Sequence, residues 1–507
     1  MDKKIIHKFR LLGLSLRKDA LIAIKEIIQQ TDKVDDTLNI VSSNIAKLCT
    51  RGSIVEEYQV RQVMNGYEGN EWNCKEEVFG VYNAFTTPLL RYEGSTRQYS
   101  LQESNTTFLF ESSYRSSIPS ESLAIVKSRV LRSKQFDSNT EVPPLVAIES
   151  LLGIQTDSSF VSLLGVLSRN PSNLNEFFLE DQPGRILLDL TQTEFQSGFF
   201  CEGMIVLVVG VIQGSVFYVQ SMCHPPAERR ITSLNLLHEV EYLDVIPGSD
   251  KEESLRHEEE ENETMFVILN EVELDHPKTM KRLNKVFEGY SLISPPPIFI
   301  LIGDFISSSF SLDSSGITHL IRLFDSLTSI LQSYPTLIQN AHFIFIPGPR
   351  DVGSTGLLPQ FPLSSFLTST LQSLFKDHPD HLIFTSNPSR IRFCTQEICV
   401  FRDDLLQRLT TNAINSTMTT DVNECLVKTV IRQGTLSPFT YHSMPRSPVL
   451  EPFLRLFPLP DLLIIGEKRS QMILEYSGCQ VVIPGSFVEG KFVVYRPSTR
   501  ETEFSEV

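Results

Sequence analysis

The sequence lacks any apolar run long enough to cross a lipid bilayer. Its longest apolar stretches, Pro295 to Ile302 and Met204 to Ile212, fall well short of the roughly 20 residues that a membrane-spanning helix needs. The start of the chain, residues 1–10, has basic residues but lacks the short apolar block and small-residue cleavage site of a secretory signal. We therefore expect a protein without a membrane segment that is not exported.

Cysteine pairs with the spacing of a metal or redox motif are also missing. The nearest two of the eight cysteines, Cys394 and Cys399, are spaced unlike a zinc knuckle or a redox pair. The others are scattered along the chain: Cys49, Cys74, Cys201, Cys223, Cys425 and Cys479. Free thiols in a reducing compartment are therefore expected.

Positive charge is scarce. The chain has 45 basic and 61 acidic residues, a formal charge of −16, so long-range attraction to nucleic-acid phosphates is not expected. Any contact with DNA would be indirect or local. The length of 507 residues and the 41% apolar content are enough for about two to four domains with cores of their own. The sequence predicts a multidomain α+β protein.

Residues 1–75 have the periodicity of helices. Apolar residues recur at helical spacing in two stripes: Leu21, Ile24, Ile27 and Ile28, and Leu38, Val41, Ile45 and Leu48. The charges of this segment are nearly balanced, which favours packing or partner contact over DNA binding. We expect a small helical domain here.

Residues 76–144 are less regular, and we interpret them as a linker and connecting segment. The stretch from Glu103 to Ser122 is rich in polar residues with few apolar anchors, which favours a loop. A basic cluster follows on an expected helix, where a solvated face is favoured over phosphate binding: Lys127, Arg129, Arg132 and Lys134.

Residues 145–248 change to short β-type runs separated by turn residues. The runs are 161–167, 176–179, 185–190, 204–211 and 215–219. Five such runs suit a small barrel of the oligonucleotide-binding (OB) type. The range 145–250 contains four basic and 13 acidic side chains, a balance that repels phosphate. Core or protein-interface positions are therefore expected for its aromatic residues: Phe177, Phe178, Phe199, Phe200, Phe217 and Tyr218.

Residues 249–263 include consecutive glutamates from Glu258 to Glu261, and we interpret this charge run as a solvated acidic linker. Residues 264–507 return to buried-strand runs, with an amphipathic helix over 317–331. The runs are 265–269, 298–302, 343–346, 381–384, 462–465 and 480–483. Continuous apolar strands indicate an α/β domain whose sheet is covered on both faces, and the loops after its strands are where a site would be built.

Polar loops directly follow three of these strands. They read Asn270-Glu271-Val272-Glu273, Gly303-Asp304-Phe305 and Pro347-Gly348-Pro349-Arg350-Asp351. In order and spacing they resemble the calcineurin-like metallophosphoesterases, whose loops bind two metal ions that activate water and clamp phosphate. The segments Arg432 to Pro438 and Asp461 to Arg469 resemble two further loops of that family. The resemblance implies a phosphoesterase-like domain over residues 264–507.

Matched position by position, most metal ligands of that family are absent. Asp304 is the one unchanged metal-ligand position. Glu271 stands in place of an aspartate, Pro349 in place of an asparagine, and Arg350 in place of the catalytic histidine. Asp351 survives at a position that supports this histidine in the family. Histidine ligands are replaced at four positions: Glu273, Thr435, Glu467 and Arg469.

Metal binding, cofactors and phosphoesterase catalysis are therefore not expected. Two divalent ions about 3.5 to 4 Å apart need bridging and terminal ligands, which a single retained carboxylate cannot supply. Pro349 offers no side-chain ligand, and Arg350 would bring a cation beside the metal. We expect Asp304 to be structural, paired with Arg350 or capping a helix. The alternative is an unorthodox phosphodiesterase site made from Glu271, Glu273, Asp304 and Asp351.

An OB barrel before an inactivated phosphoesterase domain is similar to the B subunits of eukaryotic replicative DNA polymerases, in particular to their epsilon branch. The segments that carry this resemblance are Phe177 to Leu190, Phe343 to Asp351, Phe384 to Phe393, Cys394 to Asp404, Pro458 to Ile465 and Ile483 to Phe487. The helical start, Phe9 to Leu16, resembles the N-terminal domain of that branch, which is similar to the helical lid of AAA+ proteins. Each motif alone is weak, but their order along the chain is specific.

The resemblance implies a non-catalytic accessory subunit of the DNA polymerase epsilon complex in chromosomal replication, located in the nucleus. Its implied partners are the zinc-containing C-terminal domain of the catalytic subunit, other polymerase subunits and components of the replicative helicase. A large acidic surface agrees with protein partners. Two alternatives remain: a B subunit of a sister replicative polymerase, and an OB-fold binder of single-stranded nucleic acid, which requires salt-sensitive affinity for oligonucleotides.

Overall fold

The computed structural model describes residues 78–507 apart from 103–111, 134–142, 152–158, 183, 238–239, 308–313, 353–355 and 416–420, together with scattered positions before residue 78. The chain forms two compact units, Met1–Glu77 and Val78–Val507. In the first unit, β1 (Ser15–Leu16) pairs in parallel with β2 (Ile54–Val55). The helical domain predicted over residues 1–75 lies mostly outside the described residues.

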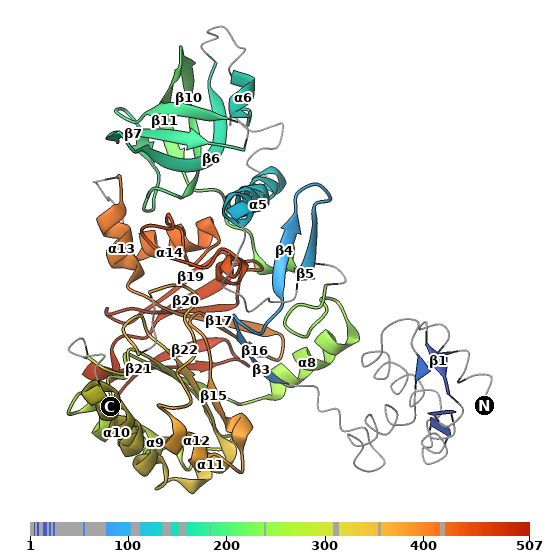
Figure 1. Ribbon diagram of the computed structural model, residues 1–507, viewed down its shortest axis with the longest axis vertical. Coiled ribbons are helices and arrows are strands. Elements are labelled where there is room, and N and C mark those ends of the chain that lie inside the picture. Colours follow the sequence, from blue (N-terminus) through green and yellow to red (C-terminus); the bar gives the residue numbers. More distant parts are fainter. Residues whose placement is uncertain are drawn as a thin grey trace. The chain divides into compact units, whose positions relative to one another are not determined.

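Five strands of the second unit close a barrel (Figure 1). The strands of this sheet are β6 (Val161–Asn170), β7 (Asn173–Glu180), β8 (Arg185–Asp189), the short β9 (Glu194–Phe195), β10 (Ile205–Gln213) and β11 (Val216–Cys223). β6, β7 and β8 form an antiparallel meander, β8 pairs in parallel with β11, and β10 pairs with both β11 and β6. The predicted barrel of the OB type is confirmed, with strand ends that differ by a few residues.

Two six-stranded sheets form the larger domain of this unit. The first has the order β15-β14-β13-β12-β21-β22 and the second has the order β19-β20-β18-β17-β16-β3. The strands of the first are β12 (Phe266–Asn270), β13 (Ile298–Ile302), β14 (His342–Ile346), β15 (Leu382–Phe384), β21 (Lys491–Arg496) and β22 (Glu501–Glu506). Those of the second are β3 (Phe79–Asn83), β16 (Ser389–Phe393), β17 (Gln396–Arg402), β18 (Leu462–Gly466), β19 (Met472–Tyr476) and β20 (Cys479–Ile483). All six predicted strand runs of this domain are present.

The two sheets pack face to face and are covered outside by helices. Phe266 and Ile268 of β12 pack between the sheets with Ile398 and Val400 of β17, while Val267 of β12 faces the helices on the other side. The helices of the first sheet are α9 (Thr279–Tyr290), α10 (Ser314–Leu331), α11 (Pro335–Asn340), α12 (Ser369–Leu374), η2 (Pro379–His381) and η4 (Phe487–Glu489). The remaining short ones are α6 (Ile148–Leu151), α7 (Arg230–Leu234) and η3 (Glu451–Leu454). In the described part of the chain, no helix is both long and apolar enough to cross a membrane.

The barrel is anchored to the larger domain through α13 (Leu405–Asn412) and α14 (Val422–Gln433). The backbone N–H of Phe199 donates to Oγ1 of Thr429 at 2.9 Å, and that of Ile205 donates to Oε1 of Gln433 at 3.0 Å. Apolar side chains of the barrel, both helices and the second sheet form one continuous core. These contacts make the barrel and the sandwich one structural unit.

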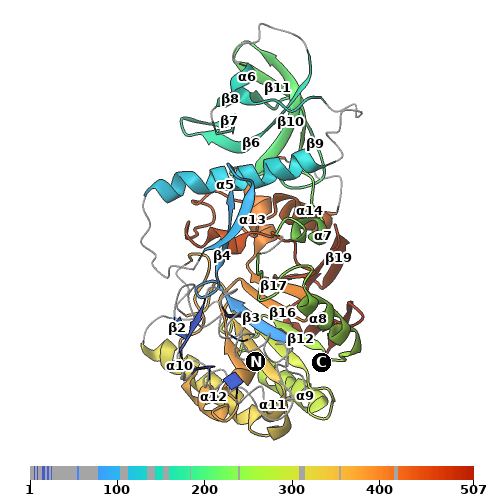
Figure 2. The ribbon, with the colours of Figure 1, turned by 90° about the vertical axis from the view of Figure 1, so that its right-hand side faces the viewer.

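The segment interpreted as a linker over residues 76–144 is largely structured, so that prediction is wrong. β3 completes the second sheet beside β16, and β4 (Leu89–Glu93) and β5 (Gln98–Gln102) form a hairpin. The polar stretch up to Ser122 includes the start of α5 (Ser112–Arg132), which lies between the barrel and the sandwich (Figure 2). The helix expected for the basic cluster is present, but Arg129 is buried and not part of a solvated face.

The acidic linker predicted over residues 249–263 is also wrong, because this stretch forms α8 (Asp250–Glu261). The hydroxyl of Ser249 caps the helix by accepting the backbone N–H of Glu252. Glu259 is buried and accepts hydrogen bonds from the hydroxyl of Thr395 and the side-chain amide of Gln396, both at 2.6 Å. Contacts with a distant β-hairpin thus hold Glu259, whereas Glu258, Glu260 and Glu261 of the charge run are exposed to solvent.

Candidate functional site

The loops that follow the parallel strands meet at one edge of the two sheets. In the first sheet, Asn270, Ile302 and Ile346 are register partners at the ends of β12, β13 and β14. In the second, Arg402 at the end of β17 is the register partner of Gly466 at the end of β18. Because the two sheets face each other, residues just after these strand ends converge. This edge forms the candidate site.

Asp304 is fully buried in this site and is held by Arg350. Oδ2 of Asp304 accepts a hydrogen bond from Nε of Arg350 at 2.6 Å and lies 2.5 Å from its Nη2. Oδ1 accepts the backbone N–H of Arg350 at 2.8 Å. Arg350 therefore engages both carboxylate oxygens in charge-assisted hydrogen bonds, and the expected pairing of Asp304 with Arg350 is present.

Arg402, which the sequence motifs did not single out, brings a second guanidinium to the site. It is fully buried, and its Nη2 lies 3.2 Å from Oδ2 of Asp304 and 3.5 Å from Oε1 of Glu271. Its Nε donates to the carbonyl of Gly303 and its Nη1 to that of Gly466. Arg402 thus ties the two sheets together. The available signal was a charged residue that ends a buried apolar strand.

Glu271, Glu273 and Lys468 complete the cluster. Oε1 of Glu271 lies 3.1 Å from Nζ of Lys468 and 3.8 Å from Nη2 of Arg350. Oε1 of Glu273 lies 3.7 Å from Nη2 of Arg350 and 3.8 Å from Nζ of Lys468. Burial raises the pKa of Glu273, an effect that Lys468 opposes. Three cationic side chains therefore face three carboxylates: Arg350, Arg402 and Lys468 against Glu271, Glu273 and Asp304.

Asp351 joins the loops after β13 and β14. Its Oδ1 accepts the backbone N–H of Phe305 at 2.6 Å, and its Oδ2 accepts that of Gly348 at 2.7 Å. Burial, with a further contribution from Asp304, raises the pKa of Asp351 to about 7. Gly348 is needed here, since a Cβ at that position would lie 2.8 Å from the backbone nitrogen of Asp304. Asp351 acts as a brace between two loops.

Glu467, Arg469 and Pro349 lie around the cluster. Glu467 is buried, and its Oε1 accepts the backbone N–H of Leu406, near the start of α13, at 2.7 Å. Burial raises the pKa of Glu467 to about 7, while Arg469 and Arg402 lower it. The side chain of Arg469 is exposed, and Pro349 is half-buried with no polar side-chain atom. At these three former ligand positions, Glu467 is thus engaged by the backbone, and Arg469 and Pro349 offer no side-chain atom that binds metal.

Thr435 does not join this cluster, so its predicted place at a ligand position is wrong. It follows α14, where it forms a bridge with Arg455 and its hydroxyl donates to the carbonyl of Leu454. The side chain of Thr435 lines a different pocket, beside α5 and the barrel. The reason is topological: α14 ends against the barrel, whereas β17 ends at the site. Arg402 therefore takes the place expected for Thr435.

Charge-assisted hydrogen bonds in this cluster can hold the loops that follow the strands in place. Each carboxylate of the cluster faces a guanidinium or ammonium group at 2.5 to 3.8 Å. Over the described ranges, no group of three or more His, Cys, Asp or Glu side chains is arranged to hold a metal ion. The charges of the cluster are thus compensated by side chains of this chain.

We predict that Glu467→Gln makes stability less dependent on pH. The carboxyl of Glu467 loses its proton near 4.5 when unfolded and near 7 when folded, so the contribution of this group to stability is most favourable below about 4.5 and declines as pH rises toward 7. Glutamine keeps an acceptor for Leu406 without the charge. Thermal unfolding at pH 5, 6, 7 and 8 should show that the free energy of unfolding of the variant falls less steeply between pH 5 and 7, by about 1 kcal/mol per pH unit, and that the two slopes converge above pH 7. Glu475→Gln, an exposed position on β19, is the control; an equal change there would contradict the assignment.

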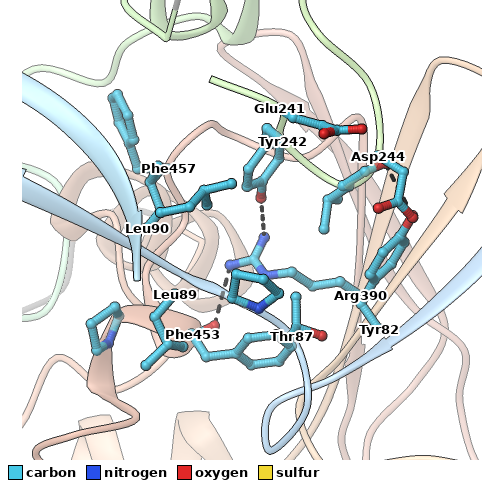
Figure 3. A pocket seen from close by; sticks show the side chains of 14 residues that line it. Tyr82, Thr87, Leu89, Leu90, Glu241, Tyr242, Asp244, Arg390, Phe453 and Phe457 are labelled. Atoms are coloured by element: carbon cyan, nitrogen blue, oxygen red, sulfur yellow. Dashed lines mark hydrogen bonds between the residues drawn. The ribbon is translucent and has the colours of Figure 1, made fainter. Parts of the chain in front are cut away.

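A separate pocket of about 140 Å³ lies between β3, β4, residues 241–244 and η3 (Figure 3). Arg390 points into it, donating to the hydroxyl of Tyr242 and the carbonyl of Phe453, both at 3.2 Å, and pairing with Glu397. The hydroxyl of Tyr82 donates to Oδ2 of Asp244 at 2.6 Å. Arg390 and the Tyr82–Asp244 pair are thus already engaged within the chain.

Two family models match the chain. Residues 266–473 match a model that describes the B subunit of DNA polymerase alpha/epsilon. Residues 112–226 match a model described as DNA polymerase epsilon subunit 2-like, OB-fold domain. The second match begins at α5, so the helix belongs with the barrel and not with a preceding linker.

Curated relatives match over nearly the full length. The DNA polymerase epsilon B subunit of Arabidopsis thaliana is 30% identical, over 99% of this chain and 98% of the relative. DNA polymerase epsilon subunit 2 of Homo sapiens is 29% identical, over 100% of this chain and 98% of the relative. Among solved structures, an archaeal phosphodiesterase is similar at 12% identity and a TM-score of 0.26, covering 48% of this chain and 99% of that one.

Proposed function

Because the chain belongs to the DNA polymerase epsilon subunit 2 family, we propose that it serves this polymerase as a non-catalytic scaffold. It is an accessory subunit of DNA polymerase epsilon in DNA replication. The observation that carries the non-catalytic part is the compensated charge cluster, in which Arg350, Arg402 and Lys468 face the carboxylates of the phosphoesterase-like loops.

Two divalent metal ions do not fit this set of side chains. An ion bound by Asp304 and Glu271 would have to displace the guanidinium of Arg402, which is fully buried and hydrogen-bonded to two backbone carbonyls. Arg350 stands at the position of the catalytic histidine, and a guanidinium has donors but no acceptor for a proton, so it cannot act as a general base. The site therefore neither binds metal nor hydrolyses phosphodiesters, and its ion pairs hold the loops in place.

The partner that this scaffold binds is the zinc-containing C-terminal domain of the polymerase's catalytic subunit. Other subunits of the polymerase and components of the replicative helicase are further partners, and the nucleus is the location. Membership of the family supports these partners, and the acidic charge of −16 supports protein over nucleic-acid contacts.

Single-strand binding by the barrel has less support. Arg185 stacks over the ring of Phe178 at 3.7 Å and pairs with Glu180 at 3.1 Å. Arg230, just after the barrel, is held by Glu397 at 2.6 Å and Asp461 at 3.1 Å. Cations that are already paired within the chain contribute little to a phosphate-binding groove.

Metal titration and partner recovery test the proposal. Calorimetric titration of the full chain with Mn²⁺ should give no stoichiometric binding, and a phosphodiester assay should give no hydrolysis above that of an Asp304→Ala variant. Co-purification from cells should recover a large polymerase subunit with the chain. Binding of two metal ions with turnover that Asp304→Ala abolishes would overturn the non-catalytic assignment, and consistent absence of the large subunit would overturn the scaffold.

A further inference from the structure

A pocket of about 230 Å³ lies where α5, the barrel and the loops after α14 meet. α5 contributes Arg129, the barrel contributes Gly203 and Ile205, and the loops contribute Arg446 and Arg455. Three guanidinium groups from two parts of the chain thus line one hollow.

The arginines of this pocket are buried and only partly paired. Arg129 and Arg455 are 8% and 7% exposed, which removes most of their contact with water. Nε of Arg129, and both Nε and Nη2 of Arg455, are buried without a hydrogen-bond partner among the described residues. The hydroxyl of Ser437 is in the same situation, whereas Nε of Arg446 makes no hydrogen bond but lies 3.5 Å from Oε1 of Glu451. Buried donors are normally paired, so these groups indicate a missing acceptor.

The remaining contacts of these arginines do not supply that acceptor. Arg129 donates to the carbonyl of Arg432, and Arg446 donates to the carbonyl of Phe439 at 2.9 Å. Arg455 pairs with Glu121 at 2.6 Å, but this carboxylate is shared with Arg91 at 3.2 Å.

The acidic side chains near this pocket are too few to balance its positive charge. Glu451 is the acidic side chain in its lining, and it lies 3.5 Å from Nε of Arg446 while accepting the hydroxyl of Tyr441 at 2.5 Å. Three guanidinium groups therefore face one lining carboxylate and two carboxylates that are shared with other arginines, Glu121 with Arg91 and Glu228 with Arg132. Burial lowers the pKa of Arg129 to about 10, which still leaves it charged at neutral pH. An anion is the complement of this charge.

Apolar side chains form the rest of the wall. They come from α5 and from the loops of the larger domain: Ile125, Val126, Phe439, Leu456 and Phe457. A bare inorganic anion would leave this surface without a partner, whereas a small molecule with an apolar body would cover it. The pocket of Figure 3 also has apolar walls, but its arginine differs: Arg390 is already engaged by Tyr242, Glu397 and two carbonyls.

We propose that the pocket lined by Arg129, Arg446 and Arg455 binds a small organic oxyanion, with a carboxylate or phosphate group on the guanidinium side and an apolar body against Phe439 and Phe457. Side chains turn toward the bound group so that their free N–H groups donate to its oxygens. The ligand then bridges α5 and the larger domain. This site lies apart from the charge cluster around Asp304.

Two probes that share a phenyl ring, one with a phosphate and one with a carboxylate, distinguish the two kinds of oxyanion. Phenyl phosphate and benzoate, each titrated into the full chain by calorimetry, should show saturable binding for at least one of them, and inorganic phosphate should bind more weakly than phenyl phosphate. Arg129→Gln should weaken binding by about tenfold or more, because one charged donor is lost. Lys127→Gln, an exposed position on the same helix, should leave it unchanged.

A second variant keeps the test valid if Arg129→Gln unfolds the chain. Ser437→Glu places a carboxylate beside the arginines, so it should abolish probe binding while leaving the melting temperature equal to or above that of the parent. The proposal is overturned if neither probe binds saturably, if inorganic phosphate binds as well as phenyl phosphate, if Arg129→Gln binds like the parent, or if Ser437→Glu lowers the melting temperature.

Discussion

Arg402→Met is expected to lower the free energy of unfolding by about 3 to 5 kcal/mol, since it removes a fully buried guanidinium that pairs with the buried carboxylates of Asp304 and Glu271. Arg402 is fully buried and contacts Asp304, Glu271 and Asp404, and its loss also frees the carbonyls of Gly303 and Gly466. Methionine fills a similar volume, so lost packing contributes little. Urea unfolding at pH 7, followed by circular dichroism, measures the change.

The controls for this prediction separate charge from packing. Arg500→Met removes an exposed guanidinium that lies 3.6 Å from Glu259, and it should cost less than about 1 kcal/mol. Asp304→Asn combined with Arg402→Met should recover part of the lost stability, because the uncompensated charge is gone. If Arg402→Met is no more destabilising than Arg500→Met, the cluster does not hold the loops.

Glu397→Gln is expected to lower the free energy of unfolding by about 3 kcal/mol or more at pH 7. Glu397 is buried between Arg390 and Arg230, which lies 2.6 Å from its Oε2, and it also accepts the hydroxyl of Tyr242 at 3.0 Å. An amide cannot neutralise two buried guanidinium groups. Thermal unfolding and limited proteolysis of residues 230–245 measure the loss, because Arg230 and Tyr242 anchor that segment.

The effect of Glu397→Gln should depend on pH in a defined direction. Burial alone would raise the pKa of Glu397, but Arg390 and Arg230 hold it below its ordinary value of 4.5. The stabilisation by the carboxylate is therefore complete above about 4.5 and is lost as pH falls through the lower folded pKa. The difference in free energy of unfolding between parent and variant should become smaller in acid. A difference that grows there would contradict this role of Glu397.

The fold was predictable from the sequence where burial alone determines the element. β12 and β13 are continuous apolar runs, and the structure buries every residue of both strands. β16 and β17 were missed because Arg390, Arg392 and Glu397 interrupt their apolar pattern. Their polar groups bond to residues far away in the chain: Arg392 to the hydroxyl of Tyr82, and Glu397 to Arg230 and to the hydroxyl of Tyr242. Such distant partners give no local signal in the sequence.

The candidate site was predictable as far as its loops follow recognisable strands. Glu271, Asp304 and Arg350 were found because each lies directly after an apolar run, and register brings these strand ends together. Arg402 was missed because its strand was missed. Thr435 was placed wrongly because a motif without its strand does not give a position in space. α8 was misread because the partners of Glu259 lie 136 residues or more away.

The place of β3 at the edge of the second sheet bears on how the chain is made. Tyr82 on β3 and its hydrogen-bond partner Arg392 on β16 are 310 residues apart. At a translation rate of about 5 to 20 residues per second, the ribosome needs roughly 15 to 60 seconds to deliver β16 after β3 has emerged. During that interval the barrel strands are already synthesised while β3 has no neighbour. Completion of the sandwich is therefore a late event in biosynthesis, after the barrel that interrupts it.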